Sequence, residues 1–225
     1  MSYKRIKNQI IEAITGEQGM HLTDTLDNEL EALIDEVKSL STFSPVSRQS
    51  TCTHNLSEGR IEVDSLVFES KSLARYIEGA NSCIIMAATL GPRIESRMNI
   101  LQLTDMSKAY LFDLVCLHYL EYCLDEWERT IRDQLEKESL YVSGRFSPGY
   151  GDLKLELQKQ VLKYLDAQKR VGIELTQNNL MIPQKSVTAI LGVSPNPFNR
   201  SYSRCDACLK RDNCKSRGGK HCAFQ

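Results

Sequence analysis

The chain has 225 residues and a mass of 25.6 kDa, enough for one large domain or for one domain with an appendage. Its net charge of -1 and pI near 6.4 argue against a protein that coats nucleic-acid phosphates. The N-terminus lacks the charged segment and apolar run of a signal peptide. No apolar run approaches the roughly 20 residues that span a bilayer. We therefore expect a soluble cytoplasmic protein.

The first 70 residues predict two helices followed by short strands. Apolar side chains recur at helical spacing from Ile6 to Ile14 and again from Leu26 to Leu40. The region from Phe43 to Phe68 instead breaks into alternating pieces bounded by Ser-Glu-Gly, a pattern typical of hairpin strands.

The next 70 residues predict a buried strand and a long helix. The continuous apolar run from Cys83 to Ala88 ends at Gly91-Pro92, where a new helix is expected to begin at Arg93. Between Met106 and about Lys137 the chain has no Gly or Pro, so a single long helix is expected there.

A further helix is predicted from Lys154 to Gln168 and a strand from Val187 to Leu191. Long helices with scattered strands that never form a βαβ rhythm predict an α+β fold. No G-x-G-x-x-G follows a predicted strand, so no dinucleotide site is visible.

The run Gly144-Arg145-Phe146-Ser147-Pro148-Gly149-Tyr150 has the composition of a ligand-binding loop. The guanidinium of Arg145 can donate two parallel N–H bonds to a carboxylate. Gly149 lets the backbone approach a bound group, and Tyr150 offers a ring face and a hydroxyl. From local chemistry alone the run also fits an ordinary Pro-Gly turn with an incidental surface arginine.

The order of motifs around this run resembles the activation domain of cobalamin-dependent methionine synthase. Arg-x-x-x-Gly-Tyr at 145–150 is followed by a helix-like segment, by Ile173 to Thr176 and by Met181 to Val187. Gln177 and Asn178 stand where the family has a Glu-Ser pair.

Thr89-Leu90-Gly91 also resembles a turn of the family, so the resemblance spans about 80–195 and is most specific over 145–187. It implies long helices packed on a mixed, largely antiparallel sheet. The Ser194-Pro195-Asn196-Pro197 stretch is expected to be a linker, so residues 1–197 would form the activation-domain-like domain and residues 198–225 a Cys-rich tail outside it.

The resemblance implies S-adenosylmethionine as the ligand. Arg145 would anchor its carboxylate, the backbone around Ser147 and Gly149 would approach its adenine or ribose, and Tyr150 would shape the site around the sulfonium. An acidic residue on the long helix, Glu121, would face its amino group. The alternative for Glu121 is an ordinary solvated charge on a helix face.

The implied function is that of a free-standing activation subunit. It would present S-adenosylmethionine to the oxidised cobalamin of a partner methionine synthase, or of a related corrinoid methyltransferase, that lacks its own activation domain. The chain has no Asp-x-His-x-x-Gly, so the cobalamin would belong to the partner. A reductant protein such as a flavodoxin or ferredoxin would supply the electron. Alone, the chain is not expected to be active.

The tail carries Cys205, Cys208, Cys214 and Cys222, with His221 beside the last of them. In a reducing cytosol, clustered thiols more often hold metal than form disulfides. Either zinc or an iron–sulfur cluster fits the ligands. The alternative is a disordered basic tail, since five Lys and Arg residues surround the cysteines.

The remaining cysteines and histidines are weaker candidates for a functional site. Cys83, Cys116 and Cys123 are expected to be small buried hydrophobes. His54 and His118 have no partner at metal or triad spacing and are expected to be structural or surface residues.

Two rival functions come from other classes of protein. The first is a metal-binding electron-transfer or regulatory protein whose active centre is the cysteine tail. The second is a zinc-stabilised module that binds nucleic acid through the basic tail, which would show steeply salt-dependent binding.

Overall fold

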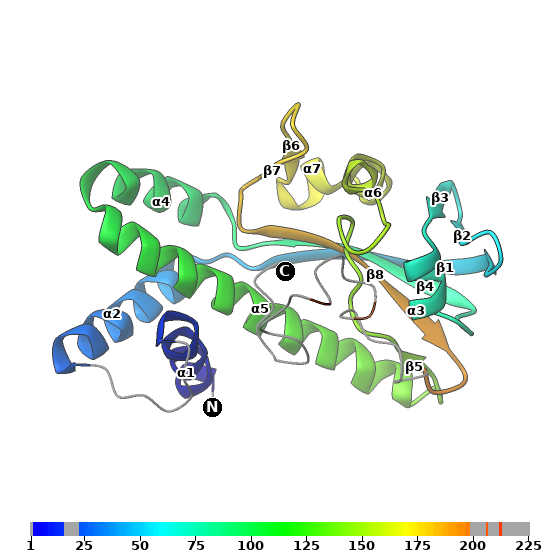
Figure 1. Ribbon diagram of the computed structural model, residues 1–225, viewed down its shortest axis with the longest axis horizontal. Helices are drawn as coiled ribbons and strands as arrows, with labels where there is room; N and C mark the ends of the chain where they lie inside the picture. Colours follow the sequence, from blue (N-terminus) through cyan, green and yellow to red (C-terminus); the bar gives the residue numbers. More distant parts are fainter. Residues whose placement is uncertain (1, 16–22, 199–205, 207–211, 213–225) are drawn as a thin grey trace.

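The centre of the protein is one antiparallel sheet of six strands in the order β3-β2-β1-β4-β8-β5 (Figure 1). The structure is a computed structural model in which residues 2–15, 23–198, 206 and 212 are described. The strands are β1 (Ser44–Asn55), β2 (Arg60–Val63), β3 (Leu66–Glu69), β4 (Ser82–Thr89), β5 (Tyr141–Val142) and β8 (Ser186–Ser194). A separate two-stranded hairpin joins β6 (Glu174–Leu175) and β7 (Met181–Ile182).

Strand β1 changes partner along its length. Its residues from Ser44 to Thr51 pair with β4, whereas those from Cys52 to Asn55 pair with β2. The last backbone bond toward the β4 side is donated by Cys52 N–H to the carbonyl of Asn81, at 3.0 Å. The β1–β4 ladder therefore ends at Cys52.

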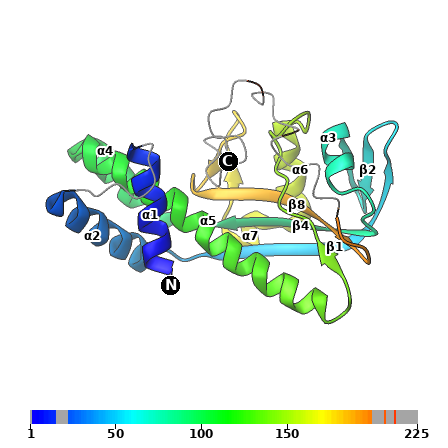
Figure 2. The ribbon, with the colours of Figure 1, turned by 60° about the horizontal axis from the view of Figure 1, so that its bottom comes forward.

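One face of the sheet is covered by α5 (Met106–Glu136), and three further helices pack around α5. They are α1 (Ser2–Thr15), α2 (Asp24–Leu40) and α4 (Pro92–Thr104). In Figures 1 and 2, α1, α2 and α4 gather around the first half of α5, and the second half of α5 continues along the sheet toward β5. Their apolar stripes bury residues such as Leu30, Leu33 and Phe112 in one hydrophobic cluster.

The opposite face is covered by shorter elements. They are α3 (Lys71–Tyr76), the 3-10 turn η1 (Leu155–Leu157), α6 (Gln158–Leu165) and α7 (Ala167–Val171). Together with the sheet they enclose a second hydrophobic cluster around Phe68, Phe146 and Val161.

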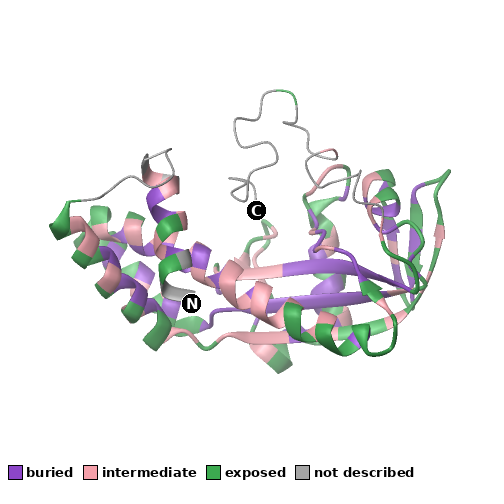
Figure 3. Cartoon of the chain, turned by 90° about the horizontal axis from the view of Figure 1, so that it is seen from below, coloured by how far each residue is buried: buried purple, intermediate pink, exposed green. Residues whose placement is uncertain are grey.

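The central strand β4 contributes to both clusters, which explains its continuous apolar sequence. Ile84, Met86 and Ala88 belong to the α5 side, whereas Cys83, Ile85 and Ala87 belong to the α6 side. Figure 3 shows the central strands as the buried middle layer between helices.

The fold class predicted from the sequence is confirmed, with every pairing between described strands antiparallel. The helix predicted from Lys154 to Gln168 is interrupted, because Asp166 adopts a left-handed conformation with φ 50° between α6 and α7. No helix in the described ranges is long and apolar enough to cross a membrane. Most of the tail lies outside the described residues.

Candidate functional site

Arg145 is buried at the edge of the sheet and is held by three carboxylates of α5. Its Nη2 lies 2.8 Å from Glu121 and 3.2 Å from Asp125, and its Nη1 lies 3.1 Å from Glu128. The three acids are spaced at i, i+4 and i+7, which places them on one face of a helix. The long helix α5 and the edge segment that carries Arg145 therefore form a charged cluster at the edge of the sheet.

A one-residue bulge aims Arg145 at α5. Val142 pairs with Val193 of β8, but Phe146 pairs with Ile190, so three residues on the edge segment face two on β8. The extra residue reverses the alternation of side chains. Val142 consequently lies in the α5 cluster and Phe146 in the α6 cluster, although residues four positions apart would share a face in a regular strand.

Hydrogen bonds fix the bulge. Ser143 N–H donates to the carbonyl of Gly192, and Gly192 N–H donates to the hydroxyl of Ser143 rather than to its carbonyl, at 2.8 Å. A Cβ on Gly144 would lie 2.4 Å from the hydroxyl of Tyr76. A side chain at the position directly before Arg145 would therefore displace the hydroxyl of Tyr76.

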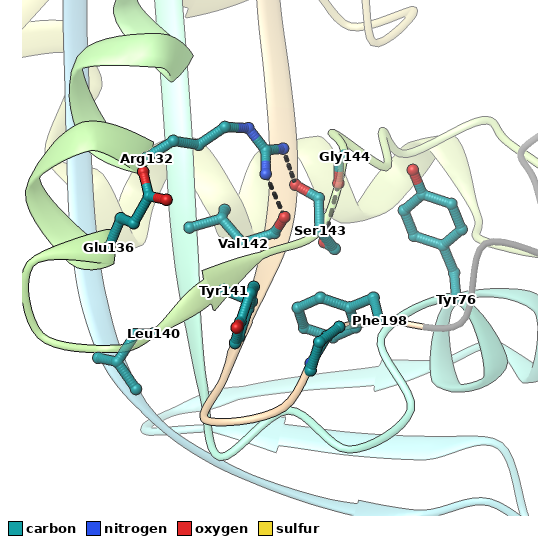
Figure 4. A pocket seen from close by; sticks show the side chains of 10 residues that line it. Tyr76, Arg132, Glu136, Leu140, Tyr141, Val142, Ser143, Gly144 and Phe198 are labelled. Carbon is teal, nitrogen blue, oxygen red and sulfur yellow. Dashed lines mark hydrogen bonds between the residues drawn. The ribbon is translucent and has the colours of Figure 1, made fainter.

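Arg132 ties the edge segment to α5 from the other side. Its guanidinium donates to Glu128 at 2.5 Å, to the carbonyl of Ser143 at 2.6 Å and to the carbonyl of Val142 (Figure 4). Glu128 therefore bridges two arginines, Arg132 and Arg145, and is only 14% exposed. Of the three acids, Glu128 is the one most firmly held.

An open cavity of about 870 Å³ adjoins this cluster. Figure 4 shows Arg132 on one side of it, Tyr76 on another and Phe198 between them. The lining residues are Tyr76, Arg132, Glu136, Leu140, Tyr141, Val142, Ser143, Gly144, Pro197 and Phe198. Its volume is within the range of small-molecule sites, about 300–1,000 Å³.

The cluster favours bound positive charge. Burial opposes the charge of Arg145, but Glu121, Glu128 and Asp125 outweigh burial and raise the pKa of Arg145 above its usual value. Three carboxylates against the two guanidiniums of Arg145 and Arg132 leave a formal charge of -1. The arrangement can accept a ligand that carries one carboxylate and a surplus of cationic groups.

The loop after Arg145 is anchored to α3. Gly149 has a φ of 96°, and its N–H donates to the carbonyl of Leu153 at 2.7 Å. Asp152 accepts from the hydroxyl of Ser70 and from the N–H groups of Lys71 and Ser72 at the start of α3. The turn from Ser147 to Leu153 is therefore closed by its own backbone bonds and attached to a neighbouring helix.

The structure brings two of the predicted site residues, Arg145 and Glu121, into direct contact. Tyr150 lies elsewhere, with its ring edge-on to Phe146 at a centroid distance of 5.8 Å. Ser147 and Gly149 contribute backbone bonds to the turn.

Sequence reasoning missed Asp125, Glu128 and Arg132 as members of this cluster. The signal was present in the i, i+4 and i+7 spacing of the acids and in the i, i+4 pair of Glu128 and Arg132. Both spacings are common on solvated helices, so they identify a site only once the edge strand is in place.

The predicted metal ligands Cys205, Cys208, Cys214 and Cys222 lie outside the described residues. Within the described ranges, no group of three His, Cys, Asp or Glu side chains could hold a metal ion. Cys83 and Cys116 are fully buried, Cys123 is half-buried, and His118 is buried on α5.

Comparison with known proteins agrees with the motifs. Residues 109–215 match the family model described as the activation domain of vitamin B12 dependent methionine synthase. The matched segment contains all five charged residues of the cluster. No curated protein matches the chain.

The fold is similar to that of a solved structure, the MetH reactivation domain bound to AdoHcy. The TM-score is 0.61 at 14% sequence identity, over 97% of this chain and 84% of that chain. The chain thus resembles the methionine synthase activation domain in sequence over its second half and in fold over nearly its whole length, and the predicted resemblance is confirmed.

Proposed function

We propose that this chain binds S-adenosylmethionine at the Arg145 cluster and supports the reductive methylation of a cobalamin held by a partner protein. The partner would be a methionine synthase, or a related corrinoid methyltransferase, without an activation domain of its own. The observation that carries the proposal is the buried Arg145 of the Arg-x-x-x-Gly-Tyr motif, held by α5 carboxylates inside the segment that matches the family.

The charge of the ligand fits the charge of the site. S-adenosylmethionine carries one carboxylate, one ammonium and one sulfonium, so its net charge is +1, opposite to the -1 of the cluster. The demethylated product, AdoHcy, lacks the sulfonium charge. Opposite charges in a partly buried site attract more strongly than in water. The site is therefore expected to hold the methyl donor more tightly than its product.

Binding exchanges ion pairs rather than creating an unpaired charge. The ligand carboxylate takes the guanidinium of Arg145 and displaces Glu121 or Asp125, which are 26% and 37% exposed. The ammonium group then pairs with the displaced carboxylate. Glu128 stays with Arg132, so the helix keeps its hold on the edge strand.

The loop residues complete the site. The backbone around Ser147 and Gly149 approaches the adenine or ribose, since Gly149 leaves no side chain in the way. Tyr150, fixed by Phe146, shapes the boundary near the sulfonium. The contribution of the protein is positioning of the methyl group, and no general acid or base is required.

The partner supplies the cobalamin, which accepts the methyl group when a one-electron donor such as a flavodoxin or ferredoxin reduces it. The chain itself holds the methyl donor at its rim, so a transient complex with a modest interface is sufficient. These components belong together in the cytoplasm.

Isothermal titration tests the ligand site. Arg145→Ala should weaken S-adenosylmethionine binding by about 1.5–3 kcal/mol, the range for a charged hydrogen-bonded contact. Tyr150→Phe should cost less because it removes only the hydroxyl. Arg129→Ala is the matched control, since Arg129 lies on α5, is 63% exposed and pairs with Glu126 and Asp133. Unchanged affinity in folded Arg145→Ala protein would remove Arg145 from the site.

A spectroscopic assay tests the activation. The chain, S-adenosylmethionine and a reductant are added to the cobalt(II) form of a methionine synthase truncated before its activation domain. The methylcobalamin spectrum should return, and omission of any one component should prevent its return. Persistent cobalt(II) with S-adenosylmethionine demonstrably bound would contradict the activation role and leave the ligand site intact.

A further inference from the structure

Two cysteines lie together on the α6 side of the sheet, away from the Arg145 cluster. Ser50 of β1 is directly opposite Cys83 of β4, so Cys52, two residues farther along β1, is the diagonal neighbour of Cys83 on the same face. Cys83 is completely buried and Cys52 is half-buried. Cys52 is therefore the more accessible residue of the pair.

The surroundings of the pair are mostly apolar. Cys52 is opposite the buried Val63 of β2, and its thiol lies 3.5 Å from the carbonyl of Ala80. His54 follows two residues later on the same face, and its Nδ1 is buried without a hydrogen-bond partner among the described residues. The half-buried thiol thus has a second thiol and an imidazole as polar neighbours.

These neighbours shift the pKa values of the two thiols in opposite directions. A hydrogen bond from Cys83, helped by His54, lowers the pKa of Cys52 to about 6 in spite of partial burial. The same contact and burial raise the pKa of Cys83. Burial raises the pKa of Cys116 to about 12 and that of Cys123 to about 11. Of these four thiols, Cys52 is the one with a lowered pKa, so it is the favoured nucleophile.

We propose that Cys52 and Cys83 form a thiol–disulfide exchange site for small-molecule disulfides. The thiolate of Cys52 attacks one sulfur of the disulfide RSSR, forming a mixed disulfide and releasing RS⁻. Cys83 then loses its proton to the released RS⁻, attacks the sulfur of Cys52 and expels the second RS⁻. Two protein thiols and RSSR become one protein disulfide and two RSH, with both electrons accepted by RSSR.

The end of the β1–β4 ladder allows the second step. Diagonal neighbours in a sheet have Cα atoms about 7–8 Å apart. A disulfide usually needs Cα atoms no farther than about 6.8 Å apart. Because β1 makes its last bond to the β4 side at Cys52, no further bonds on that side oppose a shift of its backbone toward Cys83. The resulting disulfide should be easily reduced, since it forms under some strain.

Peptide mapping of the full chain tests the exchange. Reduced protein is treated at pH 7 with oxidised glutathione, alkylated with iodoacetamide and digested without reductant. A peptide pair linked through Cys52 and Cys83 should form and should disappear after dithiothreitol, while Cys116 and Cys123 remain alkylated. Absence of the linked pair, or accumulation of glutathione on Cys52 with Cys83 still reduced, would overturn the proposal.

Two variants separate the roles of Cys83. In Cys83→Ala the glutathione adduct on Cys52 should persist, and alkylation of Cys52 should slow by about fourfold as its pKa returns toward that of an ordinary thiol. Cys83→Ser keeps a hydroxyl donor, so it should restore the alkylation rate without restoring the linked pair. An alkylation rate that is equal in all three proteins would contradict the role of Cys83.

Discussion

The face of the sheet beneath α5 and the face beneath α6 are held in different ways. On the α5 side, one helix of 31 residues carries both buried apolar side chains and the acids that hold Arg145. On the α6 side, α3, α6 and α7 have only six, eight and five residues; α6 meets α7 at Asp166, and the start of α3 is bonded to Asp152. The acids that hold Arg145 are thus carried on the long helix, whereas the glycine-containing turn lies among the short elements.

This division suits a ligand that joins the two regions. Acids on a long helix keep their spacing whether or not a ligand is present, so they can exchange partners without rearrangement of the fold. The glycine-containing turn, which must approach the ligand closely, belongs to the side with short elements. Mutations on the two faces should therefore differ in how much stability they cost.

The largest effect is expected from the core beneath α5. Phe112→Ala removes a fully buried ring and should destabilise the protein by about 3–5 kcal/mol in urea unfolding. Tyr110→Ala, on the same helix but 59% exposed, should stay within about 0.5 kcal/mol. Equal losses in the two variants would show that α5 does not organise this core.

An intermediate effect is expected where the loop meets α3. Asp152→Asn weakens the bonds from Ser70, Lys71 and Ser72 and should cost about 1–2 kcal/mol at neutral pH.

The cost of Asp152→Asn should depend on pH. Burial opposes ionisation of Asp152, but its hydrogen bonds from Ser70, Ser72 and Lys71 outweigh burial and lower its pKa below 3.8. A lowered pKa stabilises the fold above the unfolded value, and this contribution disappears as the pH falls through the folded pKa. The gap between wild type and variant in unfolding free energy should therefore close in acid, and a constant gap would contradict the role of the carboxylate.

The smallest effect is expected at the break between α6 and α7. Asp166 has a φ of 50°, which glycine adopts without strain. Asp166→Gly should therefore be neutral or stabilising by up to about 1 kcal/mol, whereas Asp166→Ala should be destabilising by a similar amount. Thermal melting of both variants measures the difference, and a more stable Ala variant would show that the turn does not need this conformation.

Local sequence patterns predicted the long helices and the buried strand of this fold. They missed the short edge strand and the break in the helix after Lys154. Helical periodicity identified α1 and α2, and the apolar run identified β4. The two residues of β5 carry no pattern of their own, because the strand exists only through its bonds to β8. The break at Asp166 was missed because the surrounding residues keep helical composition.

The candidate site was also only partly predictable, because some of its contacts depend on how distant segments pack. The motif identified Arg145 through its resemblance to a known family, and Glu121 was inferred by the same route. That Asp125 and Glu128 also reach Arg145 depends on where the edge segment lies beside α5, which no local pattern encodes.

The bulge before Arg145 makes the site depend on how the edge segment pairs with β8 as well as on its residues. If the residues from Val142 to Phe146 paired with β8 without the bulge, all five charged side chains of the cluster would still be present in the sequence. Regular alternation from Val142 would then turn Arg145 toward the apolar layer under α6 and Phe146 toward the acids of α5. The register of the edge segment against β8 is therefore as informative about ligand binding as the presence of the arginine.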